Sequence, residues 1–243
     1  MDKSPVFIVG SYRSGVNFLS TVLETSPELS VVHDEMLERK IYESVLLKKH
    51  DIEIVNRYRV LYQTTQGRMV HANYPTLWNH SMVRDIFPNA KFLCMIRDPF
   101  SIIRSMATKP LTKELLDGDN WKRYGDDHQF LGIDHAFVNN PAAHDKLYND
   151  FSLYEKCALR WVTYVKKIND LAKHDKDTFM PIVFERLVFD GEKHCKKIAK
   201  HLQFSTIPTV NNPDTTVIDK RKDFTDKERN DITRLIMNYF RYY

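Results

Sequence analysis

The segment that most constrains the fold runs over residues 6 to 19, Val-Phe-Ile-Val-Gly-Ser-Tyr-Arg-Ser-Gly-Val-Asn-Phe-Leu. Its apolar start predicts a buried strand, Gly10 and Gly15 bracket a turn, and a helix is expected to follow. The two glycines keep the GxxxxG spacing of a nucleotide triphosphate loop, but Val16 and Asn17 stand where that motif has Lys and a Mg²⁺-binding Ser or Thr. Metal-assisted phosphoryl transfer is therefore not expected.

The same turn keeps the features that hold an anion. The N–H groups of residues 14 to 18 are expected to point out of a helix N-terminus, where the backbone favours negative charge. Arg13 adds a guanidinium whose planar fork of donors suits phosphate or sulfate oxygens. Taken alone, the loop is also compatible with a structural glycine turn.

A second segment of the same kind spans residues 91 to 105. Its apolar first half predicts another buried strand that ends at Arg97, and a turn at Pro99 leads into a helix that carries Ser105. Because ligands of open α/β sheets bind at the carboxyl ends of the strands, Arg97 and Ser105 are expected to converge on one phosphate.

Together these two segments resemble the sulfotransferases that use 3′-phosphoadenosine 5′-phosphosulfate (PAPS). Arg13-Ser-Gly is similar to that family's Arg-Ser-Gly-Thr-Thr loop, which grips the 5′-phosphosulfate. Ile96-Arg-Asp-Pro, followed by Ser105, is similar to its 3′-phosphate motif. The resemblance extends to Phe87-Pro-Asn-Ala-Lys-Phe-Leu, Ile182-Val-Phe-Glu-Arg-Leu and Lys220-Arg-Lys-Asp-Phe. It covers most of the chain except residues 108 to 152.

The resemblance implies in-line transfer of a sulfuryl group from PAPS to a hydroxyl acceptor, a small molecule or a carbohydrate, with release of 3′,5′-ADP and without a metal. Arg13 is implied to be catalytic. The residues implied to bind the donor are Arg13, Ser14, Gly15, Val16, Asn17, Phe18, Arg97, Ser105, Arg221 and Lys222. Without the resemblance, the basic run that contains Arg221 and Lys222 is typical of a solvated surface.

The base that accepts the acceptor's proton is expected just after the second strand, in Val31-Val-His-Asp-Glu35. Members of the family with Arg in the loop carry a glutamate here. We order the candidates Glu35, Asp34, His33. A carboxylate desolvated beside Val32 and Met36 is expected to have a raised pKa and to act as a base near neutral pH.

One departure from the family pattern precedes the predicted helix at Trp78. Where related branches have Lys-Thr-Pro or Lys-Asp-Pro, this chain has Asn73-Tyr-Pro75. Asn73 can donate a hydrogen bond but carries no charge. We expect that His71 supplies the missing charge if it is protonated.

Alternating strands and helices predict an α/β fold, a P-loop-like parallel sheet with helices on both faces. The predicted strands are Val6–Val9, Leu29–Val32, Phe92–Ile96 and Pro181–Phe184. Apolar stripes predict helices after the loop, over Trp78–Ile86, over Trp161–Ala172 and over Cys195–Leu202, and a capping box of Thr225 and Glu228 starts the last one. We expect a single domain over residues 1–243, with a substrate-facing insertion at 108–152. Alternatively, residues 108–152 form helices that only cover the sheet.

Composition agrees with a compact enzyme. The chain has 243 residues, of which 42% are hydrophobic, and a net charge of +4 from 36 basic and 32 acidic residues that are mixed along it. This mixing does not indicate nucleic-acid binding. Neither a leader nor an apolar run of membrane-spanning length is recognised, so we expect a cytoplasmic protein. Cys94, Cys157 and Cys195 lie in apolar patterns and are expected to be reduced, buried thiols.

Two other classes stay open from the sequence. A P-loop kinase-like phosphotransferase would share the strand, the loop and the sheet, but it needs the loop lysine and a Mg²⁺ ligand. A non-catalytic nucleotide-binding protein would keep Arg97 and Ser105 and turn over no acceptor. The oligomeric state is not indicated by the sequence.

Overall fold

The computed structural model describes residues 3–34, 36–37, 40–41, 44, 51–108, 151–211 and 220–241. The chain divides into two compact units, Met1–Arg97 with Ile168–Thr215 and Asp98–Lys167 with Thr216–Tyr243. The predicted insertion lies outside the described residues, apart from its first residue and its last two.

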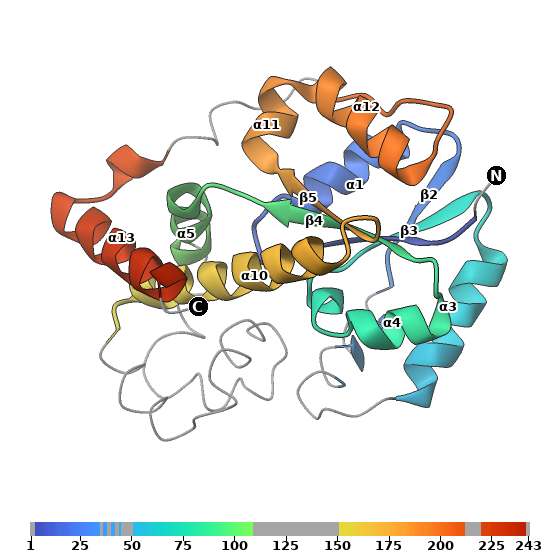
Figure 1. The fold of residues 1–243 in the computed structure, drawn as a ribbon, viewed down its shortest axis with the longest axis horizontal. Coiled ribbons are helices and arrows are strands. Elements are labelled where there is room, and N and C mark those ends of the chain that lie inside the picture. Colours follow the sequence, from blue (N-terminus) through green and yellow to red (C-terminus); the bar gives the residue numbers. More distant parts are fainter. Residues whose placement is uncertain are drawn as a thin grey trace. The chain divides into compact units, whose positions relative to one another are not determined.

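The first unit is built on a five-stranded sheet in which every pair of neighbours is parallel (Figure 1). Its strands are β1 (Val6–Gly10), β2 (Leu29–Val32), β3 (Arg68–Ala72), β4 (Lys91–Ile96) and β5 (Phe179–Val183). Their order across the sheet is β2-β3-β1-β4-β5, so the strand that leads into the glycine loop is central. The predicted α/β class with a parallel sheet is confirmed.

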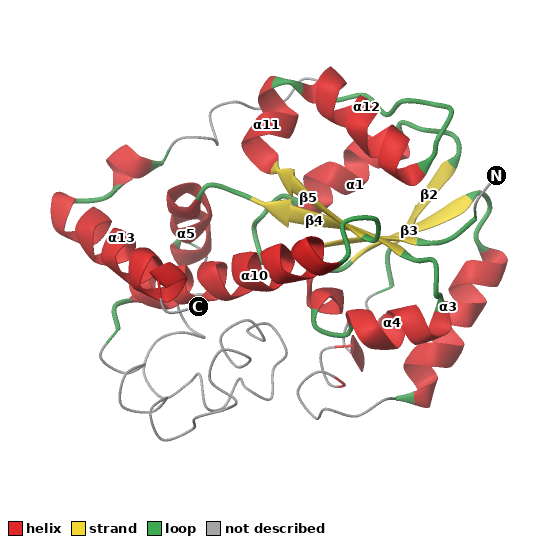
Figure 2. Ribbon diagram, viewed as in Figure 1, coloured by secondary structure: helices red, strands yellow, loops and turns green. Residues whose placement is uncertain are grey.

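Helices flank this sheet, as the sequence predicts. They are α1 (Val16–Glu24), α3 (Ile52–Thr64), α4 (His80–Ile86), α11 (Phe184–Phe189) and α12 (Gly191–Leu202), with a short 3₁₀ turn η1 (Tyr74–Leu77) after β3. Figure 2 shows α1, α11 and α12 on one side of the sheet and α3 and α4 on the other. The long helix α10 (Leu153–His174) leads back to β5.

A row of rings crosses the sheet and forms the centre of the core. Phe7 of β1 pairs in register with His71 of β3 and with Phe92 of β4, and Phe92 pairs with Phe179 of β5. The Phe7 and Phe92 ring centroids are 5.3 Å apart, and those of Phe92 and Phe179 are 4.8 Å apart. From α3, the Tyr58 ring meets Phe7 edge-on at 5.6 Å. All five side chains are fully buried or nearly so, which gives this face of the sheet its apolar contact with α3.

The second unit contains α5 (Pro99–Ala107), the first part of α10, the 3₁₀ turn η3 (Arg221–Asp223) and α13 (Asp226–Arg241). Asp98 caps α5, because its carboxylate accepts a hydrogen bond of 2.8 Å from the Ser101 N–H. The predicted capping box before α13 is confirmed. The Thr225 N–H donates to Glu228 Oε2 at 2.7 Å, and the Glu228 N–H donates to Thr225 Oγ1 at 3.3 Å.

Three element predictions need correction. The last predicted strand starts two residues late and ends one residue late, since β5 is Phe179–Val183 and Phe184 already begins α11. The helix near Trp78 starts at His80, after the η1 turn. Helix α3 and strand β3 have no counterpart among the predicted elements.

The three cysteines are free and buried, as the sequence predicts. Burial raises the pKa of the Cys157 thiol to about 12 and that of Cys195 to about 11, and it also raises the pKa of Cys94. Thiols with such pKa values are poor nucleophiles at neutral pH, so these three side chains act in packing.

None of the helices in the described ranges is both long enough and apolar enough to span a bilayer. A cytoplasmic location stays a prediction.

Candidate functional site

An open cavity of about 530 Å³ lies at the carboxyl edge of the sheet in the first unit. Every strand contributes to it from its carboxyl end: β1 through the loop that follows it, β2 through His33, β3 through Ala72, β4 through Arg97 and β5 through Phe184. The loop and the start of α1 supply Ser11, Tyr12, Arg13, Gly15, Val16, Asn17 and Phe18. This is the edge at which open α/β sheets bind their ligands.

The loop takes an unusual backbone path to reach α1. Arg13 and Gly15 both have positive φ, 69° and 101°. A Cβ at Gly15 would lie 2.5 Å from the Phe184 ring, so glycine is needed there for space as well as for conformation. Helix α1 starts at Val16 without a side-chain cap, and the N–H groups of its first turn have no acceptor within the helix. These N–H groups are available to an anion in the cavity.

The backbone N–H of Ser14 forms a hydrogen bond that the sequence did not predict. Its N–H donates to Ser11 O at 3.1 Å, inside the turn, and its side chain is 1% exposed. Ser14 is not among the residues that line the cavity. The prediction that its N–H points outward with those of Val16 and Asn17 is therefore wrong, because the turn itself uses it.

Arg97 reaches the same cavity as Arg13. Its Nη1 donates to the Arg13 carbonyl at 3.1 Å, and its Cζ lies 4.7 Å from the centre of the Phe184 ring. The Arg97 side chain is 9% exposed, whereas Arg13 is exposed. Two guanidinium groups thus line one cavity, which favours an anionic occupant.

The three candidate bases lie in different surroundings. His33 is exposed and lines the cavity. Asp34 is buried, and its carboxylate accepts hydrogen bonds from Arg57 Nε at 2.5 Å and from the Leu37 N–H at 2.9 Å. Glu35 lies outside the described residues.

The surroundings of Asp34 correct the expectation of a raised pKa. Burial raises the pKa of this carboxyl, but the hydrogen bonds from Arg57 and Leu37 and the charge of Arg57 together outweigh burial, so its pKa lies below the ordinary value. The neighbour expected to desolvate it, Met36, is 61% exposed. At neutral pH, Asp34 is therefore an ionised partner of Arg57 and a weak base.

The two residues considered as replacements for the family lysine are buried. His71 is 0% exposed, with Nδ1 3.2 Å from the Tyr58 hydroxyl. Burial lowers the pKa of His71 to about 4, although the Asp34 charge opposes this shift. His71 is thus neutral at pH 7, and the expectation that it supplies a charge is wrong. Asn73 is 2% exposed and is not among the cavity-lining residues.

In the second unit, the late basic segment lies against the start of α5. Arg221 Nη2 is 3.5 Å from Asp98 Oδ1, and its guanidinium lies 5.2 Å from the centre of the Phe100 ring. Ser105 is on the same helix, and Lys222 is exposed. The unit therefore brings Arg221 to the helix that carries Ser105. That these residues bind one phosphate together with Arg97 stays a prediction.

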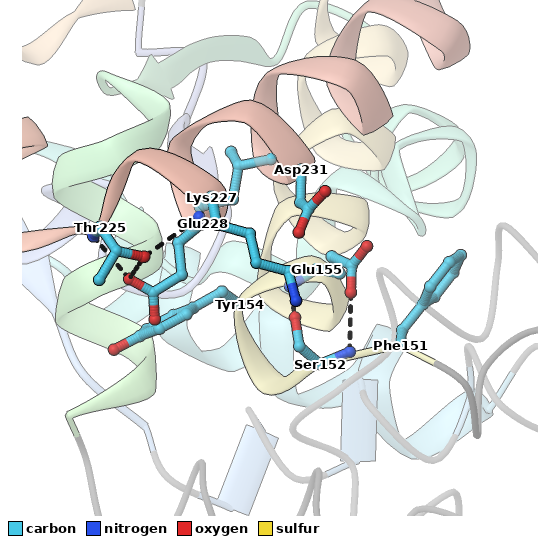
Figure 3. A pocket seen from close by; sticks show the side chains of 9 residues that line it. Phe151, Ser152, Tyr154, Glu155, Thr225, Lys227, Glu228 and Asp231 are labelled. Atoms are coloured by element: carbon cyan, nitrogen blue, oxygen red, sulfur yellow. Dashed lines mark hydrogen bonds between the residues drawn. The ribbon is translucent and has the colours of Figure 1, made fainter.

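A second cavity of about 530 Å³ lies between the starts of α10 and α13 (Figure 3). Its carboxylates are mostly engaged in helix capping. Glu155 accepts a hydrogen bond from the Ser152 N–H, and Glu228 accepts from Thr225, as Figure 3 shows. Lys227 lies among these carboxylates, so this cavity is less suited to an anion than the first one.

Among the residues that the structure describes, no group of three or more His, Cys, Asp and Glu side chains is arranged to hold a metal ion.

Comparison with solved structures decides the fold. A sulfotransferase domain from the olefin synthase of Synechococcus PCC 7002 has a TM-score of 0.58 at 17% identity, and the match covers 98% of this chain and 96% of that domain. The chain has the sulfotransferase fold. Mouse sulfotransferase SULT7A1, complexed with PAP, shares this fold with a TM-score of 0.56 at 16% identity, over 99% of this chain and 86% of that one.

A curated relative is also a sulfotransferase. Protein-tyrosine sulfotransferase of Drosophila melanogaster is 23% identical over an alignment of 219 positions that covers 81% of this chain. The chain spans 37% of the length of that relative. No family model matches the sequence. The predicted resemblance to the sulfotransferases is confirmed by these two independent comparisons.

Sequence reasoning missed Phe184 and Ala72 as parts of the cavity. Phe184 lies in the stretch Ile182-Val-Phe-Glu-Arg-Leu, which already supported the resemblance, but it was expected as the end of a strand. Ala72 ends β3, a strand without a clear apolar run.

Proposed function

We propose that this protein transfers a sulfuryl group from PAPS to a hydroxyl group of a small-molecule or carbohydrate acceptor and releases 3′,5′-ADP. The observation that carries the proposal is the cavity at the carboxyl edge of the sheet, in which Arg13, Arg97 and the first N–H groups of α1 surround one space. The loop lacks the lysine and the metal-binding hydroxyl of nucleotide triphosphate loops, which favours sulfuryl over phosphoryl transfer. PAP bound to a protein of the same fold supports the choice of donor.

In this proposal the donor's 5′ end occupies the loop. The N–H groups of Val16, Asn17 and Phe18 and the guanidinium of Arg13 bind the phosphosulfate. For the 3′-phosphate we keep the residues that the resemblance implies, Arg97, Ser105, Arg221 and Lys222.

The chemistry needs alignment, charge neutralisation and a proton acceptor. The acceptor oxygen attacks sulfur while the bond from sulfur to the bridging phosphate oxygen breaks, and negative charge grows on that phosphate. Arg13 is placed to stabilise this charge. We assign the acceptor's proton to His33, because it lines the cavity whereas Asp34 is paired with Arg57. Histidine is the side chain that acts most often as a general base in enzymes.

The role of His33 predicts a rate effect that a small base can reverse. Replacing His33 with alanine is expected to lower kcat about 100-fold, the usual contribution of a general base. Added imidazole is expected to restore part of the rate in His33→Ala but none in His33→Gln, which fills the space that imidazole would occupy. An unchanged kcat in His33→Ala would exclude this role and favour Glu35.

The proposed function is tested by calorimetric titration with 3′,5′-ADP, beside ATP with Mg²⁺. We expect the wild type to bind 3′,5′-ADP more tightly than ATP, because the anchors suit a 3′-phosphate and the loop does not suit a metal-bound triphosphate. Ser105→Ala is expected to lower the affinity for 3′,5′-ADP about tenfold, which is the effect of losing one hydrogen bond to a charged group.

The other outcomes identify the alternatives. A preference for ATP would favour a kinase-like phosphotransferase. Binding of 3′,5′-ADP without transfer from labelled PAPS to any hydroxyl compound in an acceptor screen would favour a non-catalytic nucleotide-binding protein. Absence of binding to either nucleotide would refute the proposed site.

A further inference from the structure

Arg97 contacts the backbone of the anion-binding loop as well as its cavity. The side chain starts at the carboxyl end of β4, is 9% exposed, and donates from Nη1 to the Arg13 carbonyl at 3.1 Å. Its guanidinium lies against the Phe184 ring, and Phe184 in turn leaves room only for glycine at position 15. Arg97, which follows β4, and Phe184, which follows β5, therefore both contact the loop and restrict its conformation.

The loop needs such support, because Arg13 adopts a conformation that non-glycine residues avoid. Its φ of 69° places it in the left-handed region, at a cost that the surrounding structure must offset. Across a trans peptide, the Arg13 carbonyl and the Ser14 N–H point in opposite directions. Arg97 binds the carbonyl, and Ser11 O accepts from the N–H at 3.1 Å. These two hydrogen bonds together orient the peptide plane that leads into Gly15 and α1.

We propose that Arg97 is a positioning residue that keeps the loop in its anion-binding conformation. The affinity of the loop for the 5′ end of the donor then depends on Arg97 even when the ligand has no 3′-phosphate. The inference rests on the proposed function and extends it: the arginine assigned to one end of the donor also organises the site for the other end.

The first test needs no nucleotide. Amide hydrogen exchange over residues 11 to 19 is compared in the wild type, in Arg97→Met, which keeps the buried volume, and in Ser105→Ala. We expect Arg97→Met to raise the exchange rate of the Ser14 N–H about tenfold, the effect of losing one hydrogen bond to a charged group, and Ser105→Ala to leave it unchanged. Unchanged exchange in Arg97→Met would overturn the proposal. If Arg97→Met does not fold, Arg97→Lys keeps the charge but lacks the planar fork, and the same result is expected of it.

The second test separates the two ends of the donor. Binding of adenosine 5′-phosphosulfate, which has no 3′-phosphate, is measured beside binding of 3′,5′-ADP. We expect Arg97→Met to weaken the binding of both ligands about tenfold or more. Ser105→Ala is expected to weaken only the binding of 3′,5′-ADP. If Arg97→Met weakens the binding of 3′,5′-ADP but not that of adenosine 5′-phosphosulfate, the positioning role is overturned. If the wild type binds neither ligand, the proposed function fails, while the exchange experiment still decides the role of Arg97.

Discussion

Replacing Arg13 with alanine is expected to lower kcat for sulfuryl transfer about 100- to 1000-fold, the effect of removing one donor that stabilises charge in a transition state. Arg13 is exposed at the cavity and lies beside the first N–H groups of α1, so its guanidinium can meet the phosphate oxygen on which charge grows. The measurement is steady-state transfer from labelled PAPS to an acceptor found by screening.

The loss in kcat depends on whether Arg13 acts in the transition state or already in the bound ground state. If it acts mainly in the transition state, kcat falls while the affinity for 3′,5′-ADP changes little. Arg13→Lys keeps the charge and is expected to retain part of the rate, because the planar fork of donors is lost but the electrostatic attraction is not. Full activity in Arg13→Ala would refute the catalytic role of this residue.

The largest expected loss of stability comes from the ring row in the core. Replacing Phe7 with alanine is expected to lower the free energy of unfolding by about 3–5 kcal/mol. The Phe7 side chain is 0% exposed, and its ring lies 5.3 Å from that of Phe92 and 5.6 Å from that of Tyr58. Its removal leaves a cavity between the centre of the sheet and α3 that these neighbours cannot fill.

Two matched variants calibrate this loss in urea unfolding followed by circular dichroism. Phe7→Leu keeps most of the apolar volume and is expected to cost less than Phe7→Ala. Phe189 is 68% exposed at the end of α11, so Phe189→Ala is expected to change the free energy of unfolding by less than about 0.5 kcal/mol. Equal losses in Phe7→Ala and Phe189→Ala would contradict the central place of the ring row.

Much of the cavity was predictable because its loop is a local structure. The glycine spacing between Gly10 and Gly15 predicts a turn between a strand and a helix, and the structure has that turn with Gly15 in the left-handed region. Of the residues implied to bind the donor, six line the cavity: Arg13, Gly15, Val16, Asn17, Phe18 and Arg97. The capping box at Thr225 was predictable for the same reason, since both partners lie within one turn of helix.

Strand β3 was missed because its polar residues find their partners far away in the chain. Arg68 is 5% exposed, and its guanidinium donates to Ser4 O and to Leu202 O. In the sequence, an arginine and a histidine interrupt what would otherwise be an apolar run of strand length. Only the tertiary structure supplies the acceptors that allow such side chains to be buried.

The sequence by itself determined the elements whose causes lie within a few residues: the glycine turn after β1, the buried strands β1 and β4, the amphipathic helices and hence the α/β class. The tertiary structure decided what each polar group does. It pairs Asp34 with Arg57, which lowers the pKa of the carboxyl, it buries His71 in its neutral form, and it brings Arg97 onto the Arg13 carbonyl. Hydrogen-bond partners and burial depend on residues that are distant in the chain and meet only when the sheet and its helices have assembled.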